Sequence, residues 1–272
     1  MNNLTNACMD LIGEVRTKTP LIHNITNYVT VNDCANAVLA IGASPIMADD
    51  AAEVEEIVSI SSALVINIGT LNQRTIESMI IAGKKANELH IPIVLDPVGA
   101  GASSLRNKAT REILSQVKID VLRGNLSEVS FVAGLSVSTK GVDTAEADLK
   151  NDAADIAKKV ANKLSCVVGI TGEVDTISDG VRVAKIANGN KLLAKVTGTG
   201  CMTSALVGSF CGATTDYYTA AVAGIAAMGI SGELAFEKTG AVGTGSFHIG
   251  IIDALSNMNS TCFAERAKID EN

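Results

Sequence analysis

The stretch "ALVINIGTLNQRTIESMIIAGKKANELHIPIVLDP" (Ala63–Pro97) decides the fold class. It begins and ends with short apolar runs, Ala63–Gly69 and Ile91–Pro97. Continuous rather than alternating apolar residues are typical of a strand that is buried on both faces. Between these runs, Thr75–Leu89 places its apolar residues on one stripe at helical spacing. This order predicts two parallel strands joined by a helical crossover.

The same alternation continues along the chain. Lys118–Asn125 and Ser165–Gly172 are predicted to be buried strands, and Ala153–Leu164 the helix before the second of them. The pattern changes in Glu173–Val196, which has Asp-Gly and Asn-Gly turn signals and flanks that tend to alternate. We expect two or three antiparallel strands there, at one edge of the sheet. Helical segments are predicted after it at about 201–213, 216–236 and 243–258.

The organisation of the whole chain follows from this pattern. The 272 residues contain no internal repeat, linker or low-complexity segment. We therefore expect a single domain over residues 1–272. Its fold class is predicted to be α/β, with a central, mostly parallel sheet, helices on both faces and an antiparallel edge.

The composition of the chain argues against several classes of binding partner. The net charge is −7, and Lys and Arg cluster only in pairs, so we expect no nucleic-acid partner and no anionic membrane surface. The six cysteines form no CxxC or metal-like spacing, and the first residues lack a signal-peptide pattern. These observations predict a cytoplasmic protein with reduced thiols. The apolar run Tyr217–Phe236 contains Glu233 and many Ala and Gly residues, which favours a buried helix over a membrane span.

The predicted strand ends indicate where a ligand binds. In an open α/β sheet, ligands bind just beyond the carboxyl ends of the strands. Polar, charged or glycine residues stand at these predicted ends: Asn67, Gly69, Asp96, Arg123, Gly124, Asn125, Thr171, Gly172 and the turn Gly198–Cys201. Glu128 is expected one turn into the helix that follows Asn125. Each of these residues has an ordinary structural explanation as well, such as a turn at Asp96 or a helix-dipole charge at Glu128. The prediction of a site depends on their joint position.

Together these residue types suit nucleotide chemistry. Asp96 and Glu128 supply the hard oxygen ligands that Mg²⁺ prefers, directly or through water. Arg123 offers a planar fork of donors to phosphate. The turn "GTGC" (Gly198–Cys201) opens a helix, whose free N–H groups and dipole favour an anion. A Walker A motif is absent, and so is GxGxxG after the first predicted strand, which argues against a nicotinamide enzyme.

At this point the sequence resembles the hydroxyethylthiazole kinase family, thiamine-salvage enzymes with the ribokinase-like fold. The resemblance runs over nearly the whole chain, from about Pro20 to Leu255. It is carried by the motifs "PLIHNITNYVTVNDCANAVLAIGASPIM" (Pro20–Met47), "INIGT" (Ile66–Thr70), "VLDPVGAGA" (Val94–Ala102), "RGNLSE" (Arg123–Glu128), "GITGEVD" (Gly169–Asp175) and "VTGTGCM" (Val196–Met202). The first motif is the most specific, whereas Asn125–xx–Glu128 and the glycine turn recur through the wider superfamily.

The resemblance implies a reaction and its small-molecule partners. Enzymes of this family phosphorylate the hydroxyl of 4-methyl-5-(2-hydroxyethyl)thiazole with ATP. By resemblance, Arg123 and Thr171 contact ATP, while Asp96 and Glu128 organise Mg²⁺. The resemblance also implies a homotrimer with active sites between subunits.

The thiazole side of the site is implied in the same way. Met47 and the backbone of Gly198 would line the thiazole pocket, and Gly198, Gly200 and Cys201 would form the catalytic turn. Met is a soft and adaptable wall for an apolar, sulfur-containing ring, although an ordinary core position explains it equally well. His23, in "IHNITN", has no visible partner in the sequence and is interpreted as a structural group.

Cys201 departs from the superfamily, which usually has an aspartate base at this position. A free thiol has a pKa of about 8.5 and is a poor base unless a helix N-terminus lowers that value. Phosphoryl transfer tolerates a weak base because positioning and charge neutralisation supply most of the catalysis. We therefore interpret Cys201 as a modest base or an orienting group.

Two other functions stay open from the residues. One is another ribokinase-like enzyme, such as a hydroxymethylpyrimidine kinase or an ATP-using hydrate dehydratase. The other is a ligand-binding protein without turnover, which the Cys201 departure would allow. The presence of both acidic residues and of Arg123 argues against the second.

Overall fold

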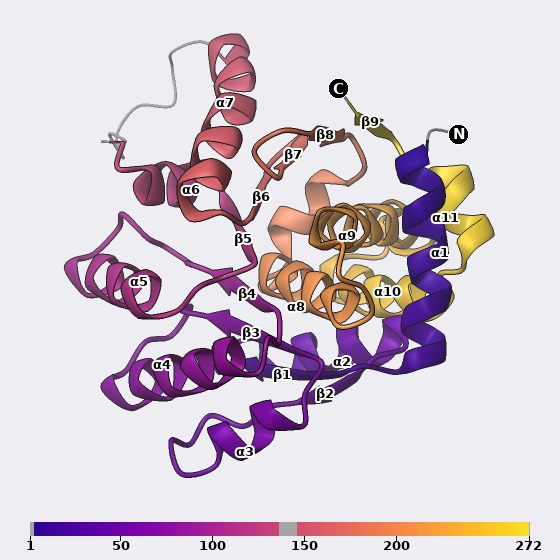
Figure 1. Ribbon diagram of the computed structural model, residues 1–272. Coiled ribbons are helices and arrows are strands. Elements are labelled where there is room, and N and C mark those ends of the chain that lie inside the picture. The colour runs from indigo at the N-terminus through magenta and orange to yellow at the C-terminus, as the bar shows by residue number, and fades with distance from the viewer. Residues whose placement is uncertain (1–2, 136–145, 272) are drawn as a thin grey trace.

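One nine-stranded sheet organises the molecule (Figure 1). The computed structural model describes residues 3–135 and 146–271. The strands follow the order β2-β1-β3-β4-β5-β6-β7-β8-β9. Their bounds are β1 (Leu21–Ile25), β2 (Ser44–Ile46), β3 (Ala63–Asn67), β4 (Ile93–Asp96), β5 (Val121–Asn125), β6 (Val167–Thr171), β7 (Asp175–Ser178), β8 (Val183–Ile186) and β9 (Ile269–Glu271).

The first six strands in this order are parallel, and the other three pair antiparallel at one edge. The predicted mostly parallel sheet with an antiparallel edge is therefore confirmed. The sequence patterns gave no sign of β1 or β2, or of β9. β2 and β9 have three residues each, and β1 has five but includes the polar residues His23 and Asn24. β9 joins the sheet by pairing with β8.

Helices cover both faces of the sheet (Figure 1). Alternate strand residues enter different cores: Ala63 and Val65 of β3 pack on one side, and Leu64 and Ile66 on the other. On the first side lie α1 (Asn3–Lys18), α2 (Val31–Ile41), α8 (Thr199–Cys211), α9 (Tyr217–Thr239), α10 (Thr244–Ser256) and α11 (Ser260–Arg266). On the second side lie α3 (Val54–Ser59), α4 (Gln73–Glu88), α5 (Ser104–Gln116), α6 (Leu126–Ala133) and α7 (Glu146–Leu164).

Small residues let α8 lie close to the sheet and to α9. A Cβ on Gly208 of α8 would lie 2.4 Å from Cγ2 of Val65 in β3. A Cβ on Gly224 of α9 would lie 2.8 Å from the backbone of Val207 in α8. These close approaches account for the Ala- and Gly-rich C-terminal helices. They also fix the first turn of α8 above the strand ends.

The apolar run near the C-terminus is a core helix. By length and composition, α9 could cross a membrane, but 83% of its most apolar window is buried inside the protein. The expectation of a buried helix is therefore confirmed in the part of the chain that the structure describes.

Two antiparallel strands, β7 and β8, lie within Glu173–Val196, in line with the expected two or three. The expectation that the turn Gly198–Cys201 ends a strand is wrong. The third possible strand is a short 3-10 helix, Lys191–Lys195, whose N-cap Asn190 accepts a hydrogen bond from the N–H of Leu192 (3.0 Å). The turn Gly198–Cys201 therefore follows this helix and does not end a strand. Asn190 competes with strand pairing because its side chain bonds the backbone locally.

Candidate active site

Side chains from six neighbouring parallel strands meet at one edge of the sheet. Met47 and Asn27 follow β2 and β1. Asn67, Asp96 and Thr171 end β3, β4 and β6, and Arg123 is the third of the five residues of β5. Asn67 and Asp96 are register partners and share the face that carries α8, as expected for a side-chain period of two. The strands thus bring together residues that are far apart in the sequence.

Asp96 is the buried acidic centre of this edge, with 1% of its surface exposed. Its Oδ2 accepts hydrogen bonds from Ser204 Oγ (2.7 Å) and Asn67 Nδ2 (3.0 Å) and lies 3.4 Å from Arg123 Nη1. Its Oδ1 is buried and has no hydrogen-bond partner among the residues that the structure describes. Burial raises the pKa of Asp96 to about 6, against the lowering effects of Arg123 and Ser204.

Arg123 connects Asp96 to Thr171 and to the glycine turn. Its Nη2 donates to Thr171 Oγ1, and the side chain is 11% exposed. A Cβ on Gly200 would lie 2.9 Å from Nη1 of Arg123. Glycine at this position therefore lets the guanidinium lie against the first turn of α8. Two positive features, a guanidinium and a helix N-terminus, converge here.

Glu128 lies one turn into α6, as expected, and closes a capping box. Its Oε2 accepts from the N–H of Asn125 (2.7 Å), and Asn125 Oδ1 accepts from the N–H of Glu128 (2.9 Å). Its Oε1 accepts from the N–H of Gly99 (2.8 Å). Glu128 therefore has a structural role in joining the Asp96 loop to α6. Each of its carboxylate oxygens still has acceptor capacity.

The glycine turn forms the N-terminus of α8. Gly198 is the N-cap with φ 87°, and a Cβ there would lie 2.4 Å from Cγ2 of Thr30. The first N–H that bonds within the helix is that of Met202, to the carbonyl of Gly198 (2.8 Å). The N–H groups of Thr199, Gly200 and Cys201 therefore point out of the helix end. Half-buried Cys201 accepts a hydrogen bond at Sγ from Asn27 Nδ2 (3.2 Å).

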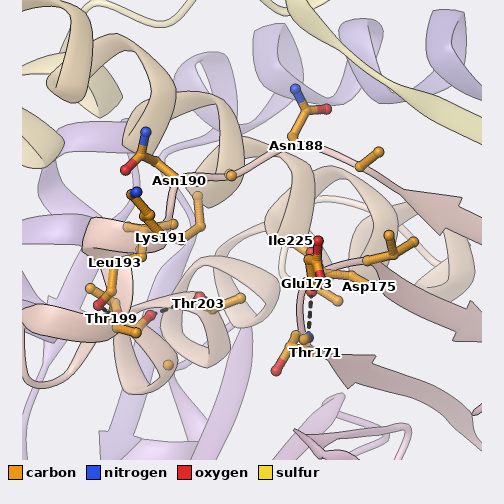
Figure 2. A pocket seen from close by; sticks show the side chains of 18 of the residues that line it. Thr171, Glu173, Asp175, Asn188, Asn190, Lys191, Leu193, Thr199, Thr203 and Ile225 are labelled. Atoms are coloured by element: carbon orange, nitrogen blue, oxygen red, sulfur yellow. Dashed lines mark hydrogen bonds between the residues drawn. The ribbon is translucent and has the colours of Figure 1, made fainter. Parts of the chain in front are cut away.

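A cavity of about 1120 Å³ opens beside this turn (Figure 2). Thr199 and Thr203 of α8 lie on one side of it, and Thr171, Glu173 and Asp175 lie across from them. Ile225, Met228, Leu193 and Phe236 supply apolar lining. A largely apolar pocket that ends at a helix N-terminus and a guanidinium fits a ligand with a flat ring and an anionic tail.

Met47 and His23, the two other residues singled out from the sequence, lie on different faces of the sheet. Met47 directly follows β2 and is partly buried against the core on the α8 side. His23 is fully buried, and its Nε2 donates to the carbonyl of Ala48 (2.8 Å). Burial lowers the pKa of His23, so the ring is a neutral structural group, in agreement with its interpretation from the sequence.

The residues around Asp96 fit Mg²⁺ bound mainly through other ligands. Among the described residues, no group of three His, Cys, Asp or Glu side chains is arranged to hold a metal ion. The partnerless buried Oδ1 of Asp96, with Glu128 close enough to raise the Asp96 pKa, offers oxygen ligands of the hard type. Mg²⁺ at such sites keeps several waters and binds substrate phosphates, so two carboxylates suffice.

The comparisons with known proteins identify the family. The sequence profile of the "HK: Hydroxyethylthiazole kinase family" matches residues 12–261. The chain belongs to the hydroxyethylthiazole kinase family. It is 65% identical to the hydroxyethylthiazole kinase of Ruminiclostridium cellulolyticum over 272 residues, covering all of both chains. It is also 61% identical to that of Clostridium beijerinckii, with 99% of each chain covered.

Solved structures agree with this membership. The hydroxyethylthiazole kinase of Pyrococcus horikoshii superposes with a TM-score of 0.90 at 41% identity, covering 98% of this chain and 99% of that one. A Bacillus subtilis pyridoxal kinase superposes with a TM-score of 0.54 at 16% identity, covering 75% of this chain and 87% of that one, and shows the fold alone. The predicted ribokinase-like fold is confirmed.

Three residues of the site were missed from the sequence. Asn27 stands within the family motif but had no chemical pattern of its own. Ser204 is a small polar residue in an apolar helix. Arg106 of α5 donates to the carbonyls of Ile68 (2.7 Å) and Gly69 (2.7 Å) and so holds the loop after β3. The strand before Asn27 was not predicted, and Ser204 and Arg106 lie within helices, so their roles emerged only from the fold.

Proposed function

We propose that this chain transfers the γ-phosphoryl group of ATP to the hydroxyl of 4-methyl-5-(2-hydroxyethyl)thiazole, as a hydroxyethylthiazole kinase of thiamine salvage. Family membership over the whole chain supports the reaction. The observation that carries it in the structure is the free N-terminus of α8, with Arg123 against it, at the mouth of the large cavity. That arrangement is suited to holding a transferring phosphoryl group.

ATP would occupy the cavity beside α8. Its base would lie on the apolar lining, and its phosphates would extend toward Arg123 and Thr171. The guanidinium would neutralise phosphate charge, while the first N–H groups of α8 would bind the transferring group. Gly200 keeps this approach open, because a Cβ there would meet the guanidinium.

Asp96 and Glu128 would hold Mg²⁺, directly or through water. The ion would supply charge neutralisation at the phosphate oxygens. The chain itself fixes both carboxylates: Ser204 and Asn67 orient Asp96, and the capping box orients Glu128.

The thiazole would lie on the other side of the glycine turn, against Met47 and the backbone of Gly198. In the reaction, the hydroxyl oxygen forms a bond to the γ-phosphorus, and the bond from that phosphorus to the bridging oxygen of ADP breaks. Cys201 would receive or orient the hydroxyl proton. Gly198, Gly200 and Cys201 are therefore proposed as the catalytic turn.

The same proposal covers the organisation of the protein. We propose one kinase domain over residues 1–272, supported by a sheet that includes strands from near both ends of the chain. A homotrimer is supported by exposed apolar residues, Tyr28 and Val29, directly after Asn27. We place the protein in the cytoplasm, where six free cysteines would stay reduced, with no nucleic-acid or membrane partner.

The test is ADP formation by the purified protein with Mg·ATP, with hydroxyethylthiazole and hydroxymethylpyrimidine offered in parallel. Turnover of the thiazole alone is expected. Turnover of the pyrimidine alone would overturn the substrate pocket but keep the phosphate site. If neither alcohol releases ADP, the chain is a binding protein and the proposed reaction is wrong.

A further inference from the structure

A chain of side-chain amides crosses the carboxyl edge of the sheet from Cys201 to Asp96. Asn27 Nδ2 donates to Cys201 Sγ (3.2 Å) and to Asn67 Oδ1 (3.1 Å). Asn67 Nδ2 in turn donates to Asp96 Oδ2 (3.0 Å). Asn27 and Asn67 are 4% and 2% exposed, so water does not compete with these bonds. Two amides thus connect the turn of α8 to the acidic centre.

Backbone N–H donors fix the direction of these hydrogen bonds between the side-chain amides. Asn27 Oδ1 accepts from the N–H (3.1 Å) and Oγ1 (3.0 Å) of Thr30, and Asn67 Oδ1 accepts from the N–H of Gly69 (2.9 Å). A backbone N–H can only donate, so flipping either amide would place a donor against a donor. It follows that an N–H of Asn27, and not its oxygen, faces the sulfur of Cys201.

Two glycines make room for the arrangement. A Cβ on Gly69 would lie 2.8 Å from Asn27 Nδ2, and a Cβ on Gly198 would lie 2.4 Å from Thr30 Cγ2. The side chain of Asn27 uses both of its N–H donors and accepts two bonds at its oxygen. Such a saturated buried amide holds one orientation, because each alternative leaves a polar group unpaired.

We propose that Asn27 is a positioning residue for phosphoryl transfer, which acts by holding the sulfur of Cys201 toward the substrate hydroxyl. The inference rests on the proposed function. The N–H of Asn27 occupies one lone pair of the sulfur, so the other lone pair of the sulfur faces away from Asn27. A sulfur held in this direction can present a lone pair to the hydroxyl proton as the new O–P bond forms.

The first test is a double-mutant cycle. Asn27→Asp keeps the shape and the oxygen that Thr30 binds but removes both N–H donors. We expect kcat to fall by about 10- to 100-fold, the cost of a misplaced reacting group, with KM for the thiazole within about threefold of the wild type. In a Cys201→Ala background, the same change should lower kcat by less than about twofold, because no sulfur is left to orient.

Two results of this cycle would contradict the proposal. Equal losses in the two backgrounds, or a loss that appears in KM, would show that Asn27 acts on the fold or on the substrate directly, and would overturn the proposal. Asn36→Ala is the matched control, because Asn36 is a part-exposed asparagine of α2 whose amide donates to Asn32 Oδ1 (3.0 Å), outside the network of Asn27. It should leave kcat unchanged. Circular dichroism checks that each variant is folded.

A second readout does not need kinase activity. Iodoacetamide alkylation of Cys201 is followed by peptide mass spectrometry, with half-buried Cys262 as the internal reference. Asn27→Asp should slow alkylation of Cys201 by about fivefold or more at pH 8, while Cys262 reacts unchanged. Equal rates at Cys201 would overturn the contact. If the wild type forms no ADP with the thiazole, the proposed function fails, and this measurement still decides the role of Asn27 toward Cys201.

Discussion

At the scale of single residues, the proposed role of Cys201 as a modest base leads to a direct prediction. A carboxyl group with a pKa of about 3.9 is ionised at pH 7, whereas a thiol with a pKa of about 8.5 is mostly protonated. The Asn27 N–H that now bonds Sγ would be available to a carboxylate oxygen in the same place.

Cys201→Asp is therefore expected to raise kcat by about 3- to 10-fold at pH 7, in steady-state assays of ADP release with Mg·ATP and the thiazole. The gain is modest because a loose transition state needs little help from a base. Cys262→Ser is the control, since Cys262 lies on α11 outside the site, and its kcat should match the wild type. A folded Cys201→Asp enzyme that is no faster would contradict the interpretation of Cys201 as a modest base.

The buried carboxyl of Asp175 makes the free energy of unfolding depend on pH. Burial raises its pKa to about 7, although the N–H of Gly172 and the charge of Arg123 act in the opposite direction. Because the folded-state pKa lies above the unfolded value of about 3.9, this carboxyl contributes stability at low pH. That contribution is lost as the pH rises from about 4 through about 7.

Asp175→Asn removes this dependence and keeps an oxygen for the N–H of Gly172. Relative to the wild type, we expect the variant to gain about 1–3 kcal/mol in unfolding free energy between pH 5 and pH 8. Urea denaturation at the two pH values measures it. Asp253→Asn, at an exposed position of α10, is the control and should show no such difference. The same difference between variant and wild type at both pH values would mean that Asp175 is charged throughout this range.

At the scale of elements, the close packing of α8 on the sheet positions the catalytic turn. Gly208 lies against Val65 of β3, so Gly208→Ala forces a Cβ into a methyl group 2.4 Å away. We expect a loss of about 1–3 kcal/mol in unfolding free energy and a raised KM for ATP, because α8 must move away from the strand ends. Gly13→Ala, in α1 with nothing within 4 Å of the added Cβ, should instead stabilise the protein by up to about 1 kcal/mol. Equal effects of the two changes would contradict this packing argument.

The sequence predicted those strands and helices whose apolar pattern lies within the segment itself. The buried strands over 63–69 and 91–97 and the helix between them stand out because apolar content and period are properties of the segment itself. The short β1 and β2 and the terminal β9 depend on partners elsewhere in the chain. At the candidate site, Asp96 and Thr171 could be predicted because they end strands, and Arg123 because it lies close to the end of one. Ser204 and Asn27 were missed because only the fold brings α8 and the loop after β1 to Asp96 and Cys201.

At the scale of the whole molecule, several exposed apolar residues lie on or beside two helices that pack together. Five large apolar residues on or beside α2 and α10 are exposed: Tyr28, Val29, Leu39, Val242 and Ile249. The two helices pack together, and Nε2 of His248 in α10 lies 2.9 Å from Oδ1 of Asp33 in α2. Monomeric proteins rarely leave such apolar groups together in water. The loop that carries Tyr28 and Val29 also carries Asn27, so an interface there would border the active site.

The homotrimer proposal can therefore be tested through this surface. Wild-type protein, with a chain mass of 28.0 kDa, should sediment as a trimer, and Leu39→Lys should sediment mainly as a monomer, because the interface would bury an unpaired charge. Thiazole kinase activity should fall with the trimer, since the loop of Asn27 loses its support. Val181→Lys is the matched control, because Val181 is equally apolar and 80% exposed, but lies between β7 and β8. A wild-type monomer with full activity would show that each active site is complete within one chain.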